Sequence, residues 1–406
     1  MFQFTKAQFK KITEGYGTPA FVYDEYTLRK NIERIFSAAA THGLTDRVTP
    51  YVAYFANSNP HLFSIVADAG ARILIQTPEE YYQLKKFHLE KNVLVSPSFL
   101  SDKDIGFWTQ QGIEINLASM EEVEQCREWY PKKPVSIRID FTMEEKQRMA
   151  VKRSQLSRLK KILAKTNTPL HSFQVYSGTG SSLEVLKTNA DFVFDIYARY
   201  FPQAKVLNFG GGFGFQYDAH RSEDNHFDWD AYFEYIAKRI KEKNIPDDIT
   251  FIIEPGRDVF ADAGSFLISV NRIVQTRHSK QIATDGSYVY MPSATVRTRQ
   301  HRTRFFSAHF RELADRDDSG FISGCTTLSS DYVFPGTIAL PQNLKKGDYI
   351  LIEDIGAYGA TQHMEFLNKR PCPEFLIRPD GTITLLTHRG SVIDKIRYTL
   401  VKPRII

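Results

Sequence analysis

The chain of 406 residues is poor in cysteine, in net charge and in long apolar runs. Its three cysteines, Cys126, Cys325 and Cys372, are unevenly spaced and form no CxxC pair, which argues against a disulfide framework and a structural zinc site. The 52 basic residues exceed the 47 acidic ones only slightly, which argues against a nucleic-acid-binding surface. No stretch approaches a membrane span and the N-terminus has no signal-peptide pattern, so we expect a cytoplasmic protein with no metal site.

The first two-thirds of the chain alternate apolar runs with amphipathic segments, and the length suits two domains. The apolar runs predict strands at 48–56, 71–77, 92–97, 114–118, 134–140, 170–176, 205–210 and 250–256. Eight β–α alternations with short connections predict an α/β fold, a closed (β/α)₈ TIM-type barrel over 25–265. A doubly wound open sheet is the alternative.

The pattern changes after about residue 265, where long helical segments give way to strand-like runs. Asp-Gly pairs at 285–286 and 380–381 are typical of turns between antiparallel strands. These runs predict a second, mostly antiparallel β domain over 266–406. The N-terminal segment 1–24, which contains the strand-like AFVYD, is predicted to join it.

A glycine-dense bend follows the seventh predicted strand, in LNFGGGFGFQY at 207–217. Its glycines stand at 210, 211, 212 and 214, where bare backbone N–H groups can converge on an anion. The eighth strand ends in EPGR, which supplies Glu254, Gly256 and Arg257. Barrels commonly hold phosphate between the loops after these two strands. The guanidinium of an arginine can donate two parallel hydrogen bonds to two oxygens of one phosphate. The alternative to a phosphate site is that the glycines only form a tight turn and that Arg257 is a surface cation.

The motifs, in this order and spacing, resemble one family. GTPAFVYDEYTLRKNI at 17–32, ANSNP at 56–60, SFQVYSG at 172–178 and GDYILIEDIGAYGA at 347–360 join the glycine bend and EPGRDV in this resemblance. The chain is similar to the ornithine, diaminopimelate and arginine decarboxylases, lyases of amino-acid metabolism. The resemblance implies pyridoxal phosphate (PLP) as cofactor, an alanine-racemase-type barrel with a C-terminal β domain, and a homodimer.

The resemblance also assigns a cradle for the cofactor. It implies that the phosphate is surrounded by Ser177, Gly210, Gly211, Gly212, Gly256, Arg257 and Tyr358. Glu254 falls where the family has a carboxylate against the pyridine nitrogen. A carboxylate there keeps the nitrogen protonated, which makes the ring an electron sink.

Several positions depart from the family pattern. Phe55 stands where the resemblance implies the lysine that forms a Schiff base with PLP, and phenylalanine cannot replace that chemistry. In the barrel, Gln174 stands where the resemblance implies a histidine that stacks on the cofactor, Tyr176 where it implies a glycine, and Leu74 where it implies an acid on the second strand. In the β domain, Thr327 stands at the position of a catalytic cysteine and Leu328 at that of the neighbouring acid. Thr327 and Asp331 remain as catalytic candidates, and Tyr288, Tyr290, Arg297 and Asp331 as candidates for selecting the substrate.

These departures leave several functions open. The chain can bind PLP, or an adduct of PLP with an amino acid, noncovalently and act on amino acids with altered activity, which we expect. It can be a non-catalytic homologue that keeps a phosphate ligand for regulation. It can also bind another phosphorylated ligand in a pocket shaped by Gln174, Tyr176 and Thr327, or retain ordinary decarboxylation through another lysine.

Overall fold

The computed structural model describes residues 5–129, 133–141, 149–217, 225–277, 279–293, 299 and 301–397. These residues form two compact units. The barrel unit contains the described parts of 28–216 and 226–259, and the β unit those of 1–27, 217–225 and 260–406. The domain boundaries expected from the sequence, 25–265 for the barrel, stay a prediction.

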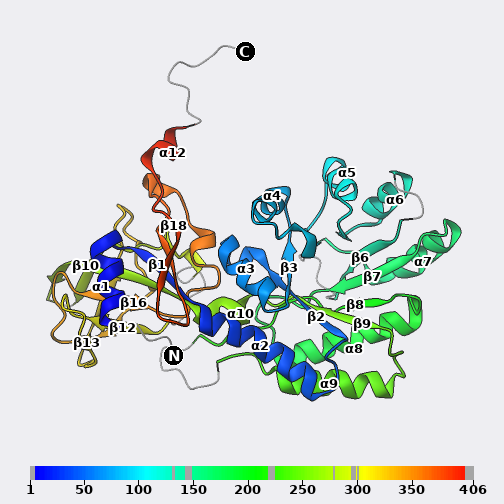
Figure 1. Cartoon of the computed structure of the whole chain (residues 1–406), viewed down its shortest axis with the longest axis horizontal. Helices are drawn as coiled ribbons and strands as arrows, with labels where there is room; N and C mark the ends of the chain where they lie inside the picture. The colour runs from blue at the N-terminus through cyan, green and yellow to red at the C-terminus, as the bar shows by residue number, and fades with distance from the viewer. Residues whose placement is uncertain are drawn as a thin grey trace, which may run out of the picture. The chain divides into compact units, whose positions relative to one another are not determined.

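The barrel unit is built on eight parallel strands, which hydrogen-bond in the order β4-β3-β2-β9-β8-β7-β6-β5 (Figure 1). Their bounds are β2 Val48–Ala53, β3 Arg72–Ile75, β4 Val93–Val95, β5 Asn116–Leu117, β6 Val135–Ile139, β7 Leu170–Val175, β8 Val206–Asn208 and β9 Thr250–Ile253. A parallel bridge between Val95 and Ile115 joins the two ends of this order. The barrel prediction is therefore confirmed, and the doubly wound sheet is wrong.

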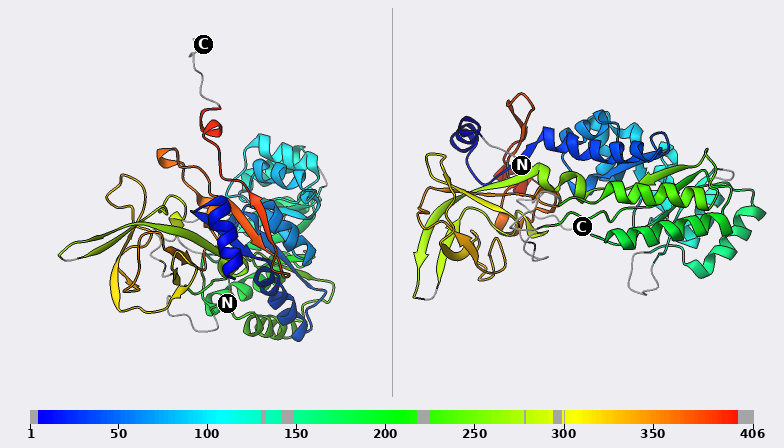
Figure 2. Two further views of the ribbon diagram at one scale, coloured as in Figure 1. Left: turned by 60° about the vertical axis from the view of Figure 1, so that its left-hand side comes forward. Right: turned by 90° about the horizontal axis from the view of Figure 1, so that it is seen from below.

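Helices follow the barrel strands and lie outside them (Figures 1 and 2). Their bounds are α2 Glu25–Thr41, α3 Pro60–Asp68, α4 Pro78–Lys86, α5 Asp102–Gln111, α6 Met120–Trp129, α7 Leu156–Lys165, α8 Leu183–Tyr200 and α9 Trp229–Glu242. Polar residues cap their first turns: Thr77 and Glu80 form a capping box on α4, and Ser101 and Asp104 form one on α5. These caps define where α4 and α5 begin.

Aromatic packing fixes the ends of β8 and β9 against α8. The ring of Phe209 lies 5.5 Å from Phe194 on α8 and 5.6 Å from Phe251 on β9. All three side chains are fully buried. Because Phe209 directly precedes the glycine bend, this cluster holds the bend in place.

The β unit contains a ten-stranded sheet with the main order β13-β12-β16-β10-β1-β17-β18, and β11, β14 and β15 extend it from β10. Its strands are β1 Ala20–Asp24, β10 Gly264–Gln275, β11 Lys280–Thr284, β12 Thr303–Phe306, β13 Glu312–Leu313, β14 Asp318–Ser323, β15 Ile338–Leu340, β16 Tyr349–Ile352, β17 Glu374–Ile377 and β18 Ile383–Thr387. The helices α1 Lys6–Tyr16 and α12 Val392–Ile396 lie near its chain ends, and α10 Arg257–Phe260 leads from β9 into it. The strand β1 pairs with both β10 and β17, so N-terminal and C-terminal segments share one sheet.

The two Asp-Gly pairs behave differently. Gly381, with φ of +83°, lies in the turn that joins the antiparallel strands β17 and β18, as predicted. The pair at 285–286 does not join a hairpin: β11, which ends at Thr284, pairs with the preceding β10 and with β14 in parallel. The Asp285 carboxylate instead accepts hydrogen bonds from Thr18 and Ser269. Among the described helices, none is both long enough and apolar enough to cross a membrane.

Candidate functional site

The glycine bend after β8 is pressed between the ends of two neighbouring strands. A Cβ atom at Gly210 would lie 2.0 Å from the carbonyl oxygen of Val175, and one at Gly211 would lie 2.6 Å from that of Glu254. At Gly212 it would lie 2.3 Å from the Gly178 oxygen. Gly210 and Gly212 also have φ of +68° and +111°, which disfavour any other residue. The bend therefore requires glycine at all three positions.

The bend presents backbone donors. Among the described residues, the N–H groups of Gly211 and Gly212 have no hydrogen-bond partner, whereas that of Gly210 donates to Asn208 Oδ1 at 2.8 Å. The Ser177 hydroxyl, just beyond β7, lies 3.5 Å from the Gly211 oxygen. Ser177, Gly210, Gly211 and Gly212 thus lie together, in an arrangement that suits an anion, and their role as phosphate ligands stays a prediction.

Glu254 lies one residue after β9 and is buried. Gln174 on β7 donates its Nε2 to Glu254 Oε2 at 2.7 Å, and Asn208 on β8 donates its Nδ2 to Oε1 at 2.8 Å. Gln174 Oε1 has no partner among the described residues. The two amides orient the carboxylate. Gln174 therefore does more than replace a ring: it is part of the support of Glu254.

Arg257 begins α10, three residues after Glu254, and only 8% of it is exposed. Gly256 beside it is buried. The next residue, Asp258, accepts hydrogen bonds from His226 Nδ1, the Phe227 N–H and Trp229 Nε1 at 3.0, 2.8 and 2.7 Å. These contacts anchor the start of α10, and with it the position of Arg257, to the segment that leads into α9.

Phe55 occupies a 3₁₀ turn, η1 Tyr54–Ala56, directly after β2. The Ala53 N–H donates to the Pro255 oxygen at 2.9 Å, so the end of β2 lies beside the residue that follows Glu254. Phe55 is half-buried, and Leu74 on β3, at the position of the expected acid, is buried. Of the lysines that the structure describes, none is buried.

Two barrel residues were not predicted from the sequence. Asn208 supports both Glu254 and Gly210, and Arg138 on β6 is buried, with its guanidinium 5.6 Å from the Tyr176 ring. The paired register Arg138–Gln174–Asn208 places the three on one level of the barrel wall. The alternation of side chains along each strand could have indicated both residues, since a polar residue at an inward position interrupts an otherwise apolar run.

The remaining candidates belong to the β unit. Asp331 is buried and accepts hydrogen bonds from Ser287 Oγ and from the N–H groups of Tyr288 and Thr326. Thr327 is exposed. Tyr290 is buried and stacks on His363 at 5.5 Å, and burial raises the pKa of its hydroxyl. Their roles, like that of Tyr358, stay predictions, and Arg297 lies outside the described residues.

Comparison with known proteins bears on this arrangement. A family model described as pyridoxal-dependent decarboxylase, pyridoxal binding domain, matches residues 29–261. The chain belongs to the pyridoxal-dependent decarboxylase family. The match covers the glycine bend, Glu254 and Arg257, and it confirms the predicted cofactor, PLP, as that of the family.

Relatives of this decarboxylase family member cover nearly the whole chain. Diaminopimelate decarboxylase of Methanothermobacter thermautotrophicus is 22% identical over 98% of this chain and 95% of its own. An L-glutamyl acyl-carrier protein decarboxylase of Niallia circulans is 23% identical over 96% and 95%. The crystal structure of diaminopimelate decarboxylase from M. jannaschii in complex with L-lysine has a TM-score of 0.84 at 19% identity, covering 97% of this chain and 94% of that one. The shared fold confirms the barrel and β domain.

Proposed function

We propose that this family member binds PLP noncovalently in the barrel and acts on amino acids with an altered decarboxylase-type activity. The observation that carries the proposal is a glycine bend with two backbone N–H groups that have no partner among the described residues, in a chain that has Phe55 where the resemblance implies the covalent lysine. The proposed phosphate cup consists of Ser177, Gly210, Gly211, Gly212, Gly256 and Arg257.

The residues present fit the cofactor. The unpartnered amides of Gly211 and Gly212 suit phosphate oxygens, and the Arg257 guanidinium would add charge-assisted hydrogen bonds. Glu254, held by Gln174 and Asn208, would receive the protonated ring nitrogen. When bound, PLP supplies an electron sink for negative charge that develops on the substrate.

This chain's own residues set limits on the chemistry. A family lysine would both form the covalent link and carry a proton, and Phe55 can do neither. Phe55 and Leu74, near the ends of β2 and β3, would instead add apolar side chains to this side of the site. The amine of an amino acid must then react with PLP directly, because no lysine amine of the protein is linked to PLP for it to displace. We therefore expect slow turnover or a different reaction.

Two measurements test the binding proposal. PLP should raise the melting temperature of the purified protein, because a ligand that binds the native state stabilises it. Borohydride treatment of the PLP complex should leave the mass of the polypeptide unchanged. A mass increase that corresponds to a reduced phosphopyridoxyl-lysine would refute noncovalent binding, and an unchanged melting temperature would refute PLP as the ligand.

A non-catalytic, regulatory role is the second candidate. The Asp331 carboxylate is occupied by donors from its own unit, and Thr327 replaces the thiol expected by resemblance, so both catalytic candidates lose support. Release of carbon dioxide from diaminopimelate, ornithine, lysine or arginine in the presence of PLP would refute this role. We also propose a homodimer, which light scattering would contradict by giving the mass of one chain.

A further inference from the structure

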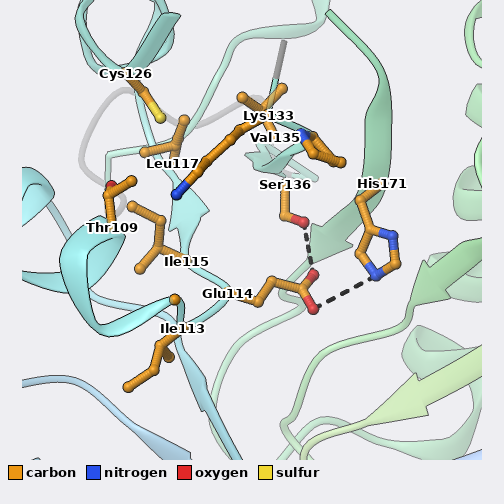
Figure 3. Close-up of a pocket in the computed structure, with 12 residues that line it drawn as sticks. Thr109, Ile113, Glu114, Ile115, Leu117, Cys126, Lys133, Val135, Ser136 and His171 are labelled. Atoms are coloured by element: carbon orange, nitrogen blue, oxygen red, sulfur yellow. Dashed lines mark hydrogen bonds and ion pairs between the residues drawn. The ribbon is translucent and has the colours of Figure 1, made fainter. Parts of the chain in front are cut away.

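A cavity of about 440 Å³ lies in the barrel unit at the amino-terminal side of β5, β6 and β7 (Figure 3). The ends of α5 and α6 contribute Thr109 and Cys126 to its wall. The glycine bend and Glu254 stand at the carboxyl ends of the strands, where barrel active sites form. The cavity therefore belongs to the opposite side of the strands and is separate from the proposed cofactor site.

Glu114 supplies a fixed acceptor in the cavity. Its Oε1 accepts hydrogen bonds from Ser136 Oγ at 2.6 Å and Ser172 Oγ at 2.7 Å. Its Oε2 has one contact among the described residues, with His171 Nε2 at 3.6 Å. This contact is an ion pair when the ring is protonated and is too long for a hydrogen bond. Two hydroxyls thus hold the carboxylate in place while the second oxygen keeps room for another donor.

Lys133 supplies the opposite charge. Figure 3 shows its side chain extending across the cavity with the amino group toward Thr109, away from the Glu114 carboxylate. Between the two charges the wall is apolar and includes Ile115 and Leu117. Small-molecule sites of this size typically combine an apolar wall with a few fixed polar groups.

We propose that this cavity binds a small ω-amino carboxylic acid. The ligand's ammonium would donate to Glu114 Oε2, and its carboxylate would meet the Lys133 ammonium. An alkyl chain would lie between them along Ile115 and Leu117. A plain carboxylic acid would offer no donor to Glu114 Oε2, and a plain amine would offer no acceptor to Lys133. The arrangement therefore favours a ligand with both charges, one at each end.

The position of the cavity gives the ligand a regulatory role, which rests on the proposed binding of PLP. Glu114 holds Ser172 on β7, and Gln174, two residues further along the same strand, holds Glu254. Ser172 and Gln174 lie on the same side of β7 because side chains alternate along a strand. A ligand that binds Glu114 and shifts its side chain would therefore shift β7, the strand whose Gln174 supports Glu254.

Calorimetric titration of the full chain with 6-aminohexanoate tests the site. We expect saturable binding, and binding at least about tenfold weaker for hexanoate and for hexylamine, since each lacks one hydrogen bond to a charged group. The substitutions Lys133→Met and Glu114→Gln should each weaken 6-aminohexanoate about tenfold. Lys161→Met, on the exposed face of α7, is the matched control and should leave the affinity unchanged.

Absence of binding at millimolar 6-aminohexanoate, or equal affinity in the Lys133→Met and Lys161→Met variants, would overturn the site. Regulation is tested by the affinity for PLP at saturating 6-aminohexanoate, which should change about fivefold or more in one direction. An unchanged PLP affinity would overturn the regulatory role. If PLP does not bind at all, the proposed function fails, whereas the titration still decides the cavity.

Discussion

Gln174 donates its side-chain amide to the Glu254 carboxylate across the barrel wall, at 2.7 Å, where the family resemblance implies a histidine. With Asn208 on the other oxygen, both acceptors of a buried carboxylate are satisfied. The position where the resemblance implies a stacking ring therefore supplies a hydrogen-bond donor to Glu254 in this chain. The two amides hold the Glu254 carboxylate in a fixed orientation, which supports the proposal of a ligand with a donor facing Glu254.

Replacement of Gln174 by leucine should lower the free energy of unfolding by about 2 kcal/mol, because it removes a hydrogen-bond donor from a buried carboxylate. Urea denaturation monitored by tryptophan fluorescence measures the change. Gln203→Leu, at an exposed position before β8, is the control and should stay within about 0.5 kcal/mol of the wild type. Equal effects of the two substitutions would show that the hydrogen bond contributes nothing.

Replacement of Arg257 by alanine should weaken PLP binding by at least about tenfold, since hydrogen bonds from a guanidinium to phosphate are charge-assisted. Fluorescence titration with PLP gives the dissociation constant. Arg158→Ala removes an exposed arginine of α7 that pairs with Glu124, and it should leave the constant unchanged. Unchanged affinity in the Arg257 variant would count against the whole phosphate cup.

Replacement of Gly210 by alanine should destabilise the barrel by about 3 kcal/mol or more, because the new Cβ meets the Val175 oxygen and φ is positive. At Gly214, the nearest atom to an added Cβ is 3.5 Å away and belongs to Gly180. Gly214→Ala should therefore cost less than about 1 kcal/mol. Urea denaturation of both variants makes the comparison, and similar losses at the two sites would contradict the close approach of Gly210 to the end of β7.

Replacement of Phe55 by lysine should restore a covalent link to PLP. Borohydride reduction followed by intact-mass spectrometry should then show the added cofactor in this variant and an unchanged mass in the wild type. Phe99→Lys introduces a lysine at a position that is 66% exposed and should remain unlabelled. Labelling of the wild type, or none in Phe55→Lys, would place the cofactor elsewhere.

Burial raises the pKa of Asp285 above its ordinary value of 3.8, although hydrogen bonds from Thr18 and Ser269 oppose the shift. Between the ordinary and the raised pKa, the folded chain binds a proton that the unfolded chain has lost. This carboxyl therefore reduces stability as pH rises through that window. The stability of the wild type minus that of Asp285→Asn should fall as pH increases from about 4, at no more than about 1.4 kcal/mol per unit. Urea denaturation between pH 4 and 7 tests the sign, and a difference that rises with pH would refute it.

Patterns among residues close in the sequence were sufficient to predict much of the fold. Alternating apolar runs predicted the eight barrel strands, because each strand and helix forms from residues close in sequence. The bend at Gly210 to Gly212 was predictable because clustered glycines directly after a strand are typical of a backbone that turns sharply and packs closely. The hairpin turn predicted at Asp285–Gly286 was wrong. An Asp-Gly pair is a local signal, whereas the Asp285 carboxylate has distant partners in Thr18 and Ser269.

The sequence by itself determined the family, the barrel and the identity of the residues in the glycine bend, because these depend on order and spacing along the chain. Only the tertiary structure decided that Gln174 and Asn208 share the two oxygens of Glu254, and that Glu114 and Lys133 face one cavity. Gln174 and Glu254 are 80 residues apart, and no local propensity records which side chains meet across a closed barrel. Their pairing follows from the register of parallel strands, which forms only when the whole sheet has folded.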